Sequence, residues 1–301
     1  MGASNEAEIE VFMSIPRVVI AGCGDIGGRL ALQLQGSGWH ATGVRRSLGK
    51  LPPGLPGLQA DFSLATCPAG WEALAPDYLV YAVAADQHDE AGYRRAYLDG
   101  LANVMSWVKQ TAQAPRRLIF VSSSSVYGQA EGEWVDEASD TCPTGYAGQI
   151  MLEAESLAGA SRIPATVVRL TGIYGPGRER LINQARQGQY AVEQPPQYGN
   201  RIHAEDAAGL IAHLLQADWA GKALAGCYLG VDDNPAPLHE VLAWLRKQLQ
   251  VEVATEAAPM RRTGSKRCSN GLARSTGWAP RYPDYQKGYA ALLQQAKGPN
   301  A

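Results

Sequence analysis

A glycine-rich turn near the amino terminus constrains the fold more than any other feature of this chain. The segment RVVIA, residues 17–21, is short, β-branched and apolar, as a buried strand is, and the glycines of AGCGDIG follow it at once. The helical periodicity of IGGRLALQLQGSGW comes next, and Gly36 and Gly38 close it. Strand, tight turn and helix in this order predict the first unit of a sheet whose strands are linked by helices.

Further along the chain, apolar segments alternate with amphipathic ones. The segments 77–85 and 117–125 have the composition of buried strands, and a long helix is expected between them over 90–111. A helix over 144–159 and a strand with a glycine-rich loop over 165–177 follow. Near-continuous apolar strands are typical of a parallel sheet covered on both faces. We therefore predict an α/β fold of the Rossmann type, a doubly wound parallel sheet.

The later part of the chain has a looser pattern, which suggests a smaller lobe. Its first stretch, residues 178–200, is polar, contains QPPQYGN and is predicted to be loop-like. We expect a disordered tail at 1–14, an NAD(P)-binding Rossmann domain at 15–177 completed by about 201–231, and a small substrate-binding lobe made of 178–200 and 232–301.

Charge and cysteine content narrow the class of partner. Lys plus Arg is 27 and Asp plus Glu is 29, so the net charge of -2 gives no field that would attract nucleic acid or an anionic membrane. The five cysteines are widely spread without a C-x-x-C, which favours neither a disulfide framework nor a zinc site. We expect a cytoplasmic protein with a small-molecule substrate, no metal, and no nucleic-acid or membrane partner.

The glycine-rich turn also predicts a ligand. Gly22, Gly24 and Gly27 form G-x-G-x-x-G directly after a strand and at the start of a helix, which is the context of dinucleotide binding. Such glycines let a pyrophosphate approach the free N–H groups of the helix amino end. Asp25 and Ile26 are expected to contact the cofactor with them. The alternative is that the glycines serve only the turn.

The end of the second predicted strand indicates which dinucleotide is bound. An enzyme that uses NAD usually has Asp or Glu there, whereas HATGVRR ends in Arg45 and Arg46. Two guanidinium groups favour a 2′-phosphate, so we predict NADP, with NAD as the alternative. The alternative is that the two arginines are exposed to solvent and bind no ligand. A third short strand is expected over 58–60, and Asp61 after it is either an adenine contact or an ordinary turn residue.

With these residues in place, the chain resembles an extended short-chain dehydrogenase/reductase, in the NAD(P)-dependent epimerase/dehydratase family. It is most similar to the divergent YeeZ-like branch, which also begins with G-x-G-x-x-G. The resemblance rests on AGCGDIG, VSSSSVYG at 121–128, Tyr146, VVRLTGIYGPG at 167–177 and RIHAED at 201–206. It implies a homodimer that pairs through the helices at 90–112 and 146–160.

The resemblance also implies a set of site residues. In catalytic members a serine four residues before the tyrosine of VYG, a later tyrosine, and a lysine four positions beyond that tyrosine act together. Here these positions are Ser123, Tyr146 and Ile150, so the lysine that would lower the pKa of the tyrosine is missing. Further cofactor contacts are expected where strands end, from Ala82, Val83, Ala84, Ser122 and Tyr174, and from Tyr146 in the helix over 144–159.

Two functions follow from this incomplete set. The first is an NAD(P)-dependent oxidoreductase or epimerase that acts on a sugar nucleotide or another small polar carbonyl or alcohol. Tyr146 would then work better as a proton donor than as a base, because a free tyrosine has a pKa of about 10. The second is a non-catalytic NADP(H)-binding sensor or interaction protein. Arg178 and Arg180, past the last glycine-rich loop, are either solvated or face an anionic part of the substrate.

Overall fold

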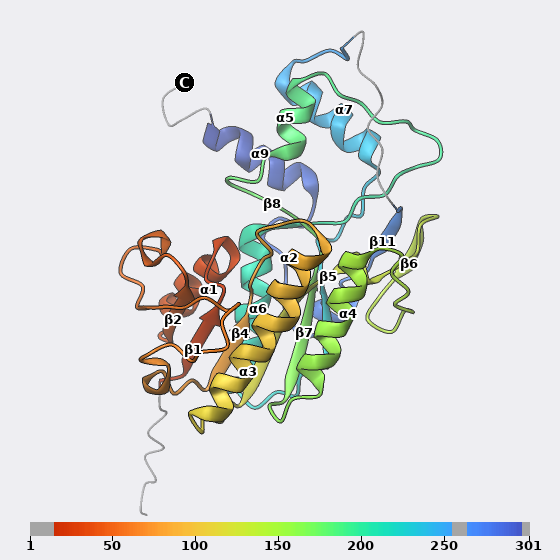
Figure 1. Cartoon of the computed structure of the whole chain (residues 1–301). Coiled ribbons are helices and arrows are strands. Elements are labelled where there is room, and N and C mark those ends of the chain that lie inside the picture. Colours follow the sequence, from red (N-terminus) through yellow and green to blue (C-terminus); the bar gives the residue numbers. More distant parts are fainter. Residues whose placement is uncertain (1–14, 255–263, 297–301) are drawn as a thin grey trace, which may run out of the picture.

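A computed structural model describes residues 15–254 and 264–296 of the chain. The predicted tail at 1–14 lies outside the described residues, as do 255–263 and 297–301 of the predicted lobe. The central feature is a sheet of seven parallel strands in the order β10-β7-β5-β4-β1-β2-β3 (Figure 1). The strands are β1 (Arg17–Ala21), β2 (His40–Arg45), β3 (Gly57–Gln59), β4 (Tyr78–Tyr81), β5 (Arg117–Ser123), β7 (Ala165–Leu170) and β10 (Cys227–Gly230). The predicted doubly wound parallel sheet is confirmed.

Helices cover both faces of this sheet. On one face, α1 (Asp25–Gly36) packs against α6 (Ala204–Trp219). The other face carries α3 (Gly100–Gln110) and α4 (Tyr146–Gly159), as Figure 1 shows. Neighbouring residues of β1 alternate between the two layers, because Val18 lies in the first core and Val19 in the second. Burial on both sides explains why the strands are apolar throughout.

The helix predicted over 90–111 contains a local irregularity. It starts as α2 (Glu90–Tyr93), widens into the π-helical segment η3 (Arg94–Asp99) and continues as α3. Asp89 caps its start by accepting a hydrogen bond of 2.7 Å from the N–H of Gly92. Single π turns inside helices often mark functional sites. Tyr97, in the middle of η3, lines the cavity that is described below.

A smaller lobe lies beyond the carboxyl ends of the strands (Figure 1). It contains α5 (Arg180–Arg186), α7 (Leu238–Leu249) and α9 (Tyr285–Ala296), which share a core with Ile182, Leu242 and Tyr289 at its centre. The prediction that all of 178–200 is loop-like was wrong at α5. This helix has seven residues, too few to show a helical period, and its burial depends on the distant α7.

Short elements join the lobe to the sheet. Two parallel pairs of strands, β8 (Gly172–Tyr174) with β9 (Arg201–His203) and β6 (Glu133–Val135) with β11 (Lys266–Cys268), lie at the junction. The remaining short helices are η1 (Leu48–Lys50), η2 (Trp71–Ala73), η4 (Ser124–Val126) and α8 (Gly271–Ser275). Within residues 15–254 and 264–296, no helix is both long and apolar enough to cross a membrane.

Buried charges lie at the base of the lobe. Arg201 is 3% exposed, and its Nε and Nη2 atoms have no hydrogen-bond partner in the described part of the chain. Asp232 is 1% exposed and is held by its backbone N–H, which donates to the Arg201 carbonyl at 2.7 Å, while its Oδ2 atom is unpaired there. Burial raises the pKa of Asp232 to about 8, although the charge of Arg201 acts in the opposite direction.

This raised pKa makes the stability of the protein depend on pH. Between the ordinary aspartate pKa of about 4 and the folded value, the folded chain binds more protons than the unfolded chain. The free energy of unfolding therefore falls as pH rises through this window. We expect Asp232→Asn to remove that fall, which amounts to at most about 1.4 kcal/mol per pH unit. Urea unfolding of both proteins at about pH 5 and about pH 8 measures it, and parallel pH profiles would contradict the assignment.

Candidate functional site

A cavity of about 740 Å³ lies over the carboxyl ends of the parallel strands. Gly22 lines it just after β1, Arg45 at the end of β2, and Ala82 just after β4. Ser123 at the end of β5 and Leu170 at the end of β7 form the opposite part of the wall. Open α/β sheets bind ligands at this edge, because the loops that follow neighbouring strands diverge there.

The three glycines of the turn have different physical roles. Gly22 has φ +83°, and a Cβ there would lie 2.4 Å from the backbone nitrogen of Val83. A Cβ on Gly27 would lie 2.9 Å from the Cγ2 atom of Ile20, so this glycine serves the packing of α1 on β1 and does not line the cavity. Gly24 lines the cavity, and a Cβ there would meet nothing closer than 3.9 Å. Only this glycine leaves open space beside the turn.

The start of α1 forms the wall next to this space. Asp25 and Ile26 line the cavity in the first turn of the helix, and α1 has no side-chain cap. First-turn N–H groups have no partner within their helix and meet the positive end of its dipole. The open space at Gly24 beside such a helix start fits a pyrophosphate. The predicted contacts Gly22, Gly24, Asp25 and Ile26 are therefore brought together.

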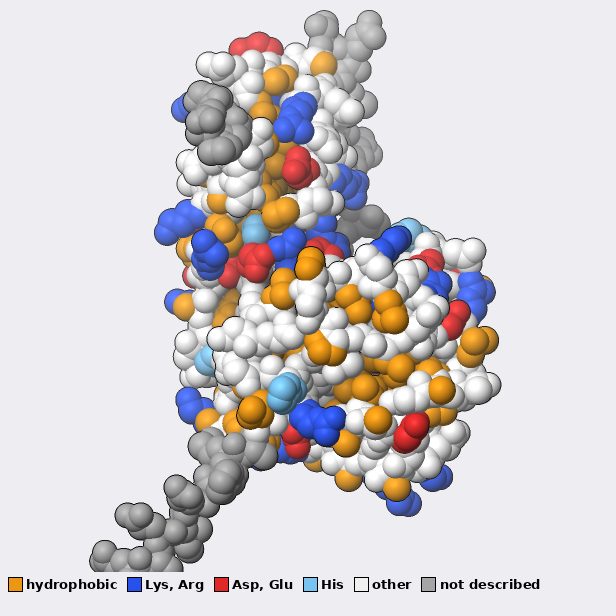
Figure 2. Space-filling model, turned by 90° about the vertical axis from the view of Figure 1, so that its left-hand side faces the viewer, with side chains coloured by type: hydrophobic (Ala, Val, Ile, Leu, Met, Phe, Trp, Pro, Cys, Tyr) orange, Lys and Arg blue, Asp and Glu red, His pale blue; other side chains and the backbone are white. Residues whose placement is uncertain are grey.

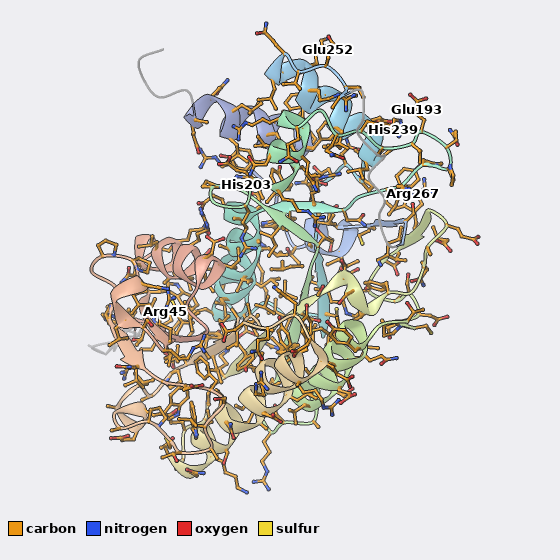
Figure 3. All side chains as sticks on the ribbon, turned by 45° about the horizontal axis from the view of Figure 1, so that its top comes forward. Arg45, Glu193, His203, His239, Glu252 and Arg267 are labelled. Carbon is orange, nitrogen blue, oxygen red and sulfur yellow. The ribbon has the colours of Figure 1, made fainter. Side chains whose placement is uncertain are left out.

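Basic side chains surround one end of the cavity. Arg45 donates from Nη1 to the carbonyls of Cys23 at 3.0 Å and Lys50 at 2.8 Å. Arg46 pairs with Asp86 at 2.7 Å. The Lys50 ammonium forms no hydrogen bond or ion pair with the described residues, and it also lines an open groove of about 780 Å³ on the outer side of α1. Figure 3 shows Arg45 on this side of the molecule, far from the lobe residues.

Other predicted cofactor contacts also line this cavity. Asp61 accepts hydrogen bonds from the hydroxyl of Ser63 at 2.7 Å and from its N–H at 3.0 Å. These two bonds hold the pKa of Asp61 below its usual value, and the bond from the hydroxyl has the larger effect. Ala82, Val83 and Ala84 line the cavity too, and their contact with a cofactor stays a prediction.

The far end of the cavity carries two serines in different states. Ser122 donates from Oγ to Glu155 at 2.5 Å, so its proton is engaged. Ser123 accepts from the N–H of Ser125 at 3.2 Å, and its own hydroxyl proton has no acceptor in the described part of the chain. Glu155 is also paired with Arg169 at 2.7 Å, so Arg169 serves a buried ion pair below the serines. Ser123 alone of these two can donate to a ligand.

Comparison with known proteins identifies the family. Residues 18–224 match the model of the NAD-dependent epimerase/dehydratase family. The chain belongs to this family. It is 30% identical to Protein YeeZ of Escherichia coli K12 over 219 residues, which cover 68% of this chain and 75% of that protein.

Solved structures of similar proteins have the same fold. One is a candidate NAD-dependent epimerase/dehydratase from Methylobacillus flagellatus, with 36% identity and a TM-score of 0.81 over 94% of this chain and 100% of that chain. Another is a UDP-glucose 4-epimerase of Thermus thermophilus in complex with NAD, with 19% identity and a TM-score of 0.76 over 94% and 99% of the two chains.

The orientation of α4 decides which family residues reach the cavity. Met151 lines the cavity, whereas Ile150 is 1% exposed and does not line it. Ala147 and Gly148, one turn before Met151, do not line it either. Ile150 therefore stands buried at the position where catalytic members of the family have a lysine.

Tyr146 lies outside the cavity, which is a correction to its predicted position. Its hydroxyl donates to the carbonyl of His88 at 2.6 Å, and its ring stands edge-on to Tyr93 at 5.5 Å. Ser123 lines the cavity and Tyr146 does not, so a role of Tyr146 beside Ser123 stays a prediction. Adjacent helix residues differ by about 100° in direction, so the spacing of motifs along the chain did not fix this.

Tyr174, like Gly27 and Tyr146, is a predicted contact that does not line the cavity. Its neighbour Ile173 lines the cavity, and adjacent residues of a strand point to opposite sides. Tyr174 is 4% exposed and packs its ring against Tyr289 of the lobe, 4.6 Å away, and against His203. Figure 3 shows His203 at the boundary between the sheet and the lobe.

Several cavity residues were not predicted from the sequence. They come from loops and helix faces that only the folded chain brings together, and they are Lys50, Asp86, Gln87, Arg95, Tyr97, Met151 and Thr171. Arg178, which was expected to be solvated or to face the substrate, also lines the cavity. Burial raises the pKa of Tyr97, so its phenol keeps its proton at neutral pH. In residues 15–254 and 264–296, no group of three or more His, Cys, Asp or Glu side chains is arranged to hold a metal.

The difference between two glycines of the turn can be tested directly. Gly24→Ala should leave the thermal midpoint within about 2 °C, because its Cβ meets open space, but should weaken dinucleotide binding at least about tenfold. Gly22→Ala should instead lower the free energy of unfolding by more than about 2 kcal/mol, through its left-handed φ and its clash with the Val83 backbone. Thermal melts and cofactor titrations of both variants measure this, and equal destabilisation by the two would contradict it.

Proposed function

We propose that this protein is an NADP(H)-dependent oxidoreductase or epimerase of the extended short-chain dehydrogenase/reductase type, acting on a small polar carbonyl or alcohol. The observation that carries the proposal is one continuous cavity that joins Lys50, the turn at Gly24 and the available hydroxyl of Ser123. A sugar nucleotide is our preferred substrate class, because a structural neighbour is a UDP-glucose 4-epimerase. The substrate would bind between Ser123 and the small lobe, and the cytoplasmic homodimer stays a prediction.

The choice of NADP rests on the balance of charge at the basic end. Arg46 already has a carboxylate partner in Asp86, and Asp61 lies nearby. Arg45 binds only carbonyl oxygens, and Lys50 has no partner among the described residues. These two cations are therefore available to a 2′-phosphate, which would give them the counter-charge that they lack.

Exchanging these cations one at a time tests the choice of cofactor. We expect Lys50→Met to weaken NADP binding about tenfold and to leave NAD binding within about twofold, because the lost charge pair is worth about 1.4 kcal/mol. Arg46→Met is the matched control, with a smaller effect because Asp86 already neutralises that charge. Fluorescence titration with NADPH and NADH measures both. Tighter binding of NADH than NADPH to the wild-type protein would overturn the preference for NADP.

The chemistry proposed for the chain's own residues centres on Ser123. When bound, the nicotinamide ring supplies or accepts a hydride. Ser123 would donate its free hydroxyl proton in a hydrogen bond to the substrate oxygen and orient it. Thr171 is a poorer donor, because its Oγ1 atom already donates to the carbonyl of Gly230 at 3.1 Å.

The sequence-based alternative is a protein that binds the cofactor without turnover. Its motivation is Ile150, which stands in place of the lysine that catalytic members of the family have. Such a protein would sense the NADP(H) pool or present a cofactor-dependent surface to a partner. Thermal stabilisation by NADPH would then be retained with no oxidation of NADPH by any carbonyl substrate.

Turnover by variants separates the two candidates. With NADPH and a panel of sugar nucleotides and small carbonyl compounds, Ser123→Ala should lower kcat at least about 100-fold if the protein is an enzyme. Tyr146→Phe should change kcat less than about threefold, because its hydroxyl is bound to the His88 carbonyl outside the cavity. Absorbance of the reduced nicotinamide follows the reaction. A wild-type protein that binds NADPH but consumes none supports the second function, and loss of activity in Tyr146→Phe would restore the tyrosine as a catalytic residue.

A further inference from the structure

We propose that Arg178, from the lobe side of the cavity, binds the diphosphate of the dinucleotide while Asp25 holds its guanidinium in place. The inference rests on the proposed dinucleotide binding and adds a residue outside the glycine-rich turn. It also replaces the two sequence-based expectations for Arg178, a solvated side chain or a substrate contact.

A tight turn aims Arg178 back across the cavity. Gly175, Pro176, Gly177 and Arg178 form a β-turn in which the N–H of Arg178 donates to the Gly175 carbonyl at 2.9 Å. Proline at the second position and a glycine with φ +78° at the third are typical of a type II turn. The sequence GPGR therefore reverses the chain after β8 and presents the arginine on the far side of the turn.

The contact made by Arg178 joins the two halves of the site. Its Nε atom donates to Oδ2 of Asp25 at 2.7 Å, across 153 positions of the chain. Both residues line the cavity, and Asp25 is the first residue of α1. Figure 2 shows Lys, Arg, Asp and Glu side chains gathered where the narrow lobe meets the larger body. This single ion pair closes part of the cavity rim.

The guanidinium has donors left for a ligand. Nε is occupied by Asp25, whereas neither Nη group donates to another residue in the described part of the chain. The Arg178 side chain is 43% exposed, so this edge is accessible from the cavity. A guanidinium matches the geometry of phosphate oxygens in pairs, and a first bond to a carboxylate fixes the orientation of the free edge.

The carboxylate of Asp25 makes such a cation necessary. An anion at the start of α1 is favoured by the helix dipole, but it repels a diphosphate at the same helix end. Burial alone would raise the pKa of Asp25, but bonds from Arg178 and Arg29 hold it below its usual value, so the carboxyl is charged. Arg29 is shared with Glu205 and lines only the outer groove. Arg178 alone of these two arginines faces the cavity.

A substrate phosphate would offer the same chemistry, so the experiment separates the two sources. Fluorescence titration with NADPH, without substrate, is made on the wild-type protein and on Arg178→Gln. We expect a loss of affinity of about 10- to 100-fold and faster dissociation. Arg180→Gln is the matched control, since it removes the same charge two residues away from an exposed side chain that does not line the cavity. Its NADPH affinity should stay within about twofold.

Competition with fragments locates the contact. Arg178→Gln should weaken 2′-phospho-ADP-ribose, which carries the diphosphate, and should leave 2′-AMP, which lacks it, within about twofold. An equal loss for both fragments would mean a general loss of charge and would overturn the proposal. Unchanged binding of NADPH to Arg178→Gln would also overturn it and would leave the dinucleotide site itself intact. A wild-type protein that binds no dinucleotide would overturn the proposed function together with this inference.

A double-mutant cycle tests the part played by Asp25. In the Asp25→Asn background the arginine has lost its anchor and the diphosphate has lost its repulsive neighbour. Arg178→Gln should therefore cost at least about threefold less affinity there than in the wild-type background. Additive losses would show that Asp25 does not position Arg178. Thermal melts of all variants confirm that each is folded.

Discussion

The close approach of the turn at Gly22 to the backbone of Val83 is the constraint on which the site depends. Because Gly22 has no Cβ, the end of β1 can lie against the chain just after β4. The N–H groups of Gly22 and Cys23 both donate to the Val44 carbonyl, at 3.0 and 3.1 Å, which ties β2 to the same point. Three strand ends thus meet at one place, and α1 begins there with its N–H groups directed at the cavity.

The direction of each side chain determines which chemical groups line the cavity. On β8, Ile173 lines the cavity and Tyr174 turns into the core of the lobe. On α4, Met151 lines it, whereas Tyr146 bonds the His88 carbonyl outside. Neither Tyr146 nor Ile150, which stands in place of the family's lysine, lines the cavity, and Ile150 is buried.

Much of the fold was predictable because its signals are local. Apolar strands, amphipathic helices and the turn at Gly22 each have a local sequence pattern, and the positions of Arg45 and Arg46 follow from where β2 ends. The small lobe was harder, because α5 is short and β6 pairs with β11 across more than a hundred residues. Three-residue strands have no detectable period, and their pairing is decided by tertiary contacts.

The site residues that belong to one continuous segment of the chain were predictable from the sequence. Those that distant loops bring to the cavity were not. Gly24 and Arg45 belong to the first βαβ unit, whose geometry is set by neighbouring residues. Lys50 enters through η1, which folds back so that the Lys50 carbonyl accepts a bond from Arg45. Arg178 enters through a turn in the second half of the chain. No spacing rule connects such residues, since each depends on the path of a loop.

The charges around Asp25 explain how an acidic residue is tolerated at a phosphate-binding helix. Asp25 bonds Arg29 and Arg178, and Arg29 is shared with Glu205 on α6. The charges of these two acids and two arginines cancel, so this part of the rim is neutral without a ligand. The Asp25 carboxylate already holds the Arg178 side chain in place. A diphosphate that binds the free edge of Arg178 gains this orientation without the entropic cost of fixing a long side chain. The same ion pair that links the lobe to α1 in the free protein thereby preorganises the site for its anionic ligand.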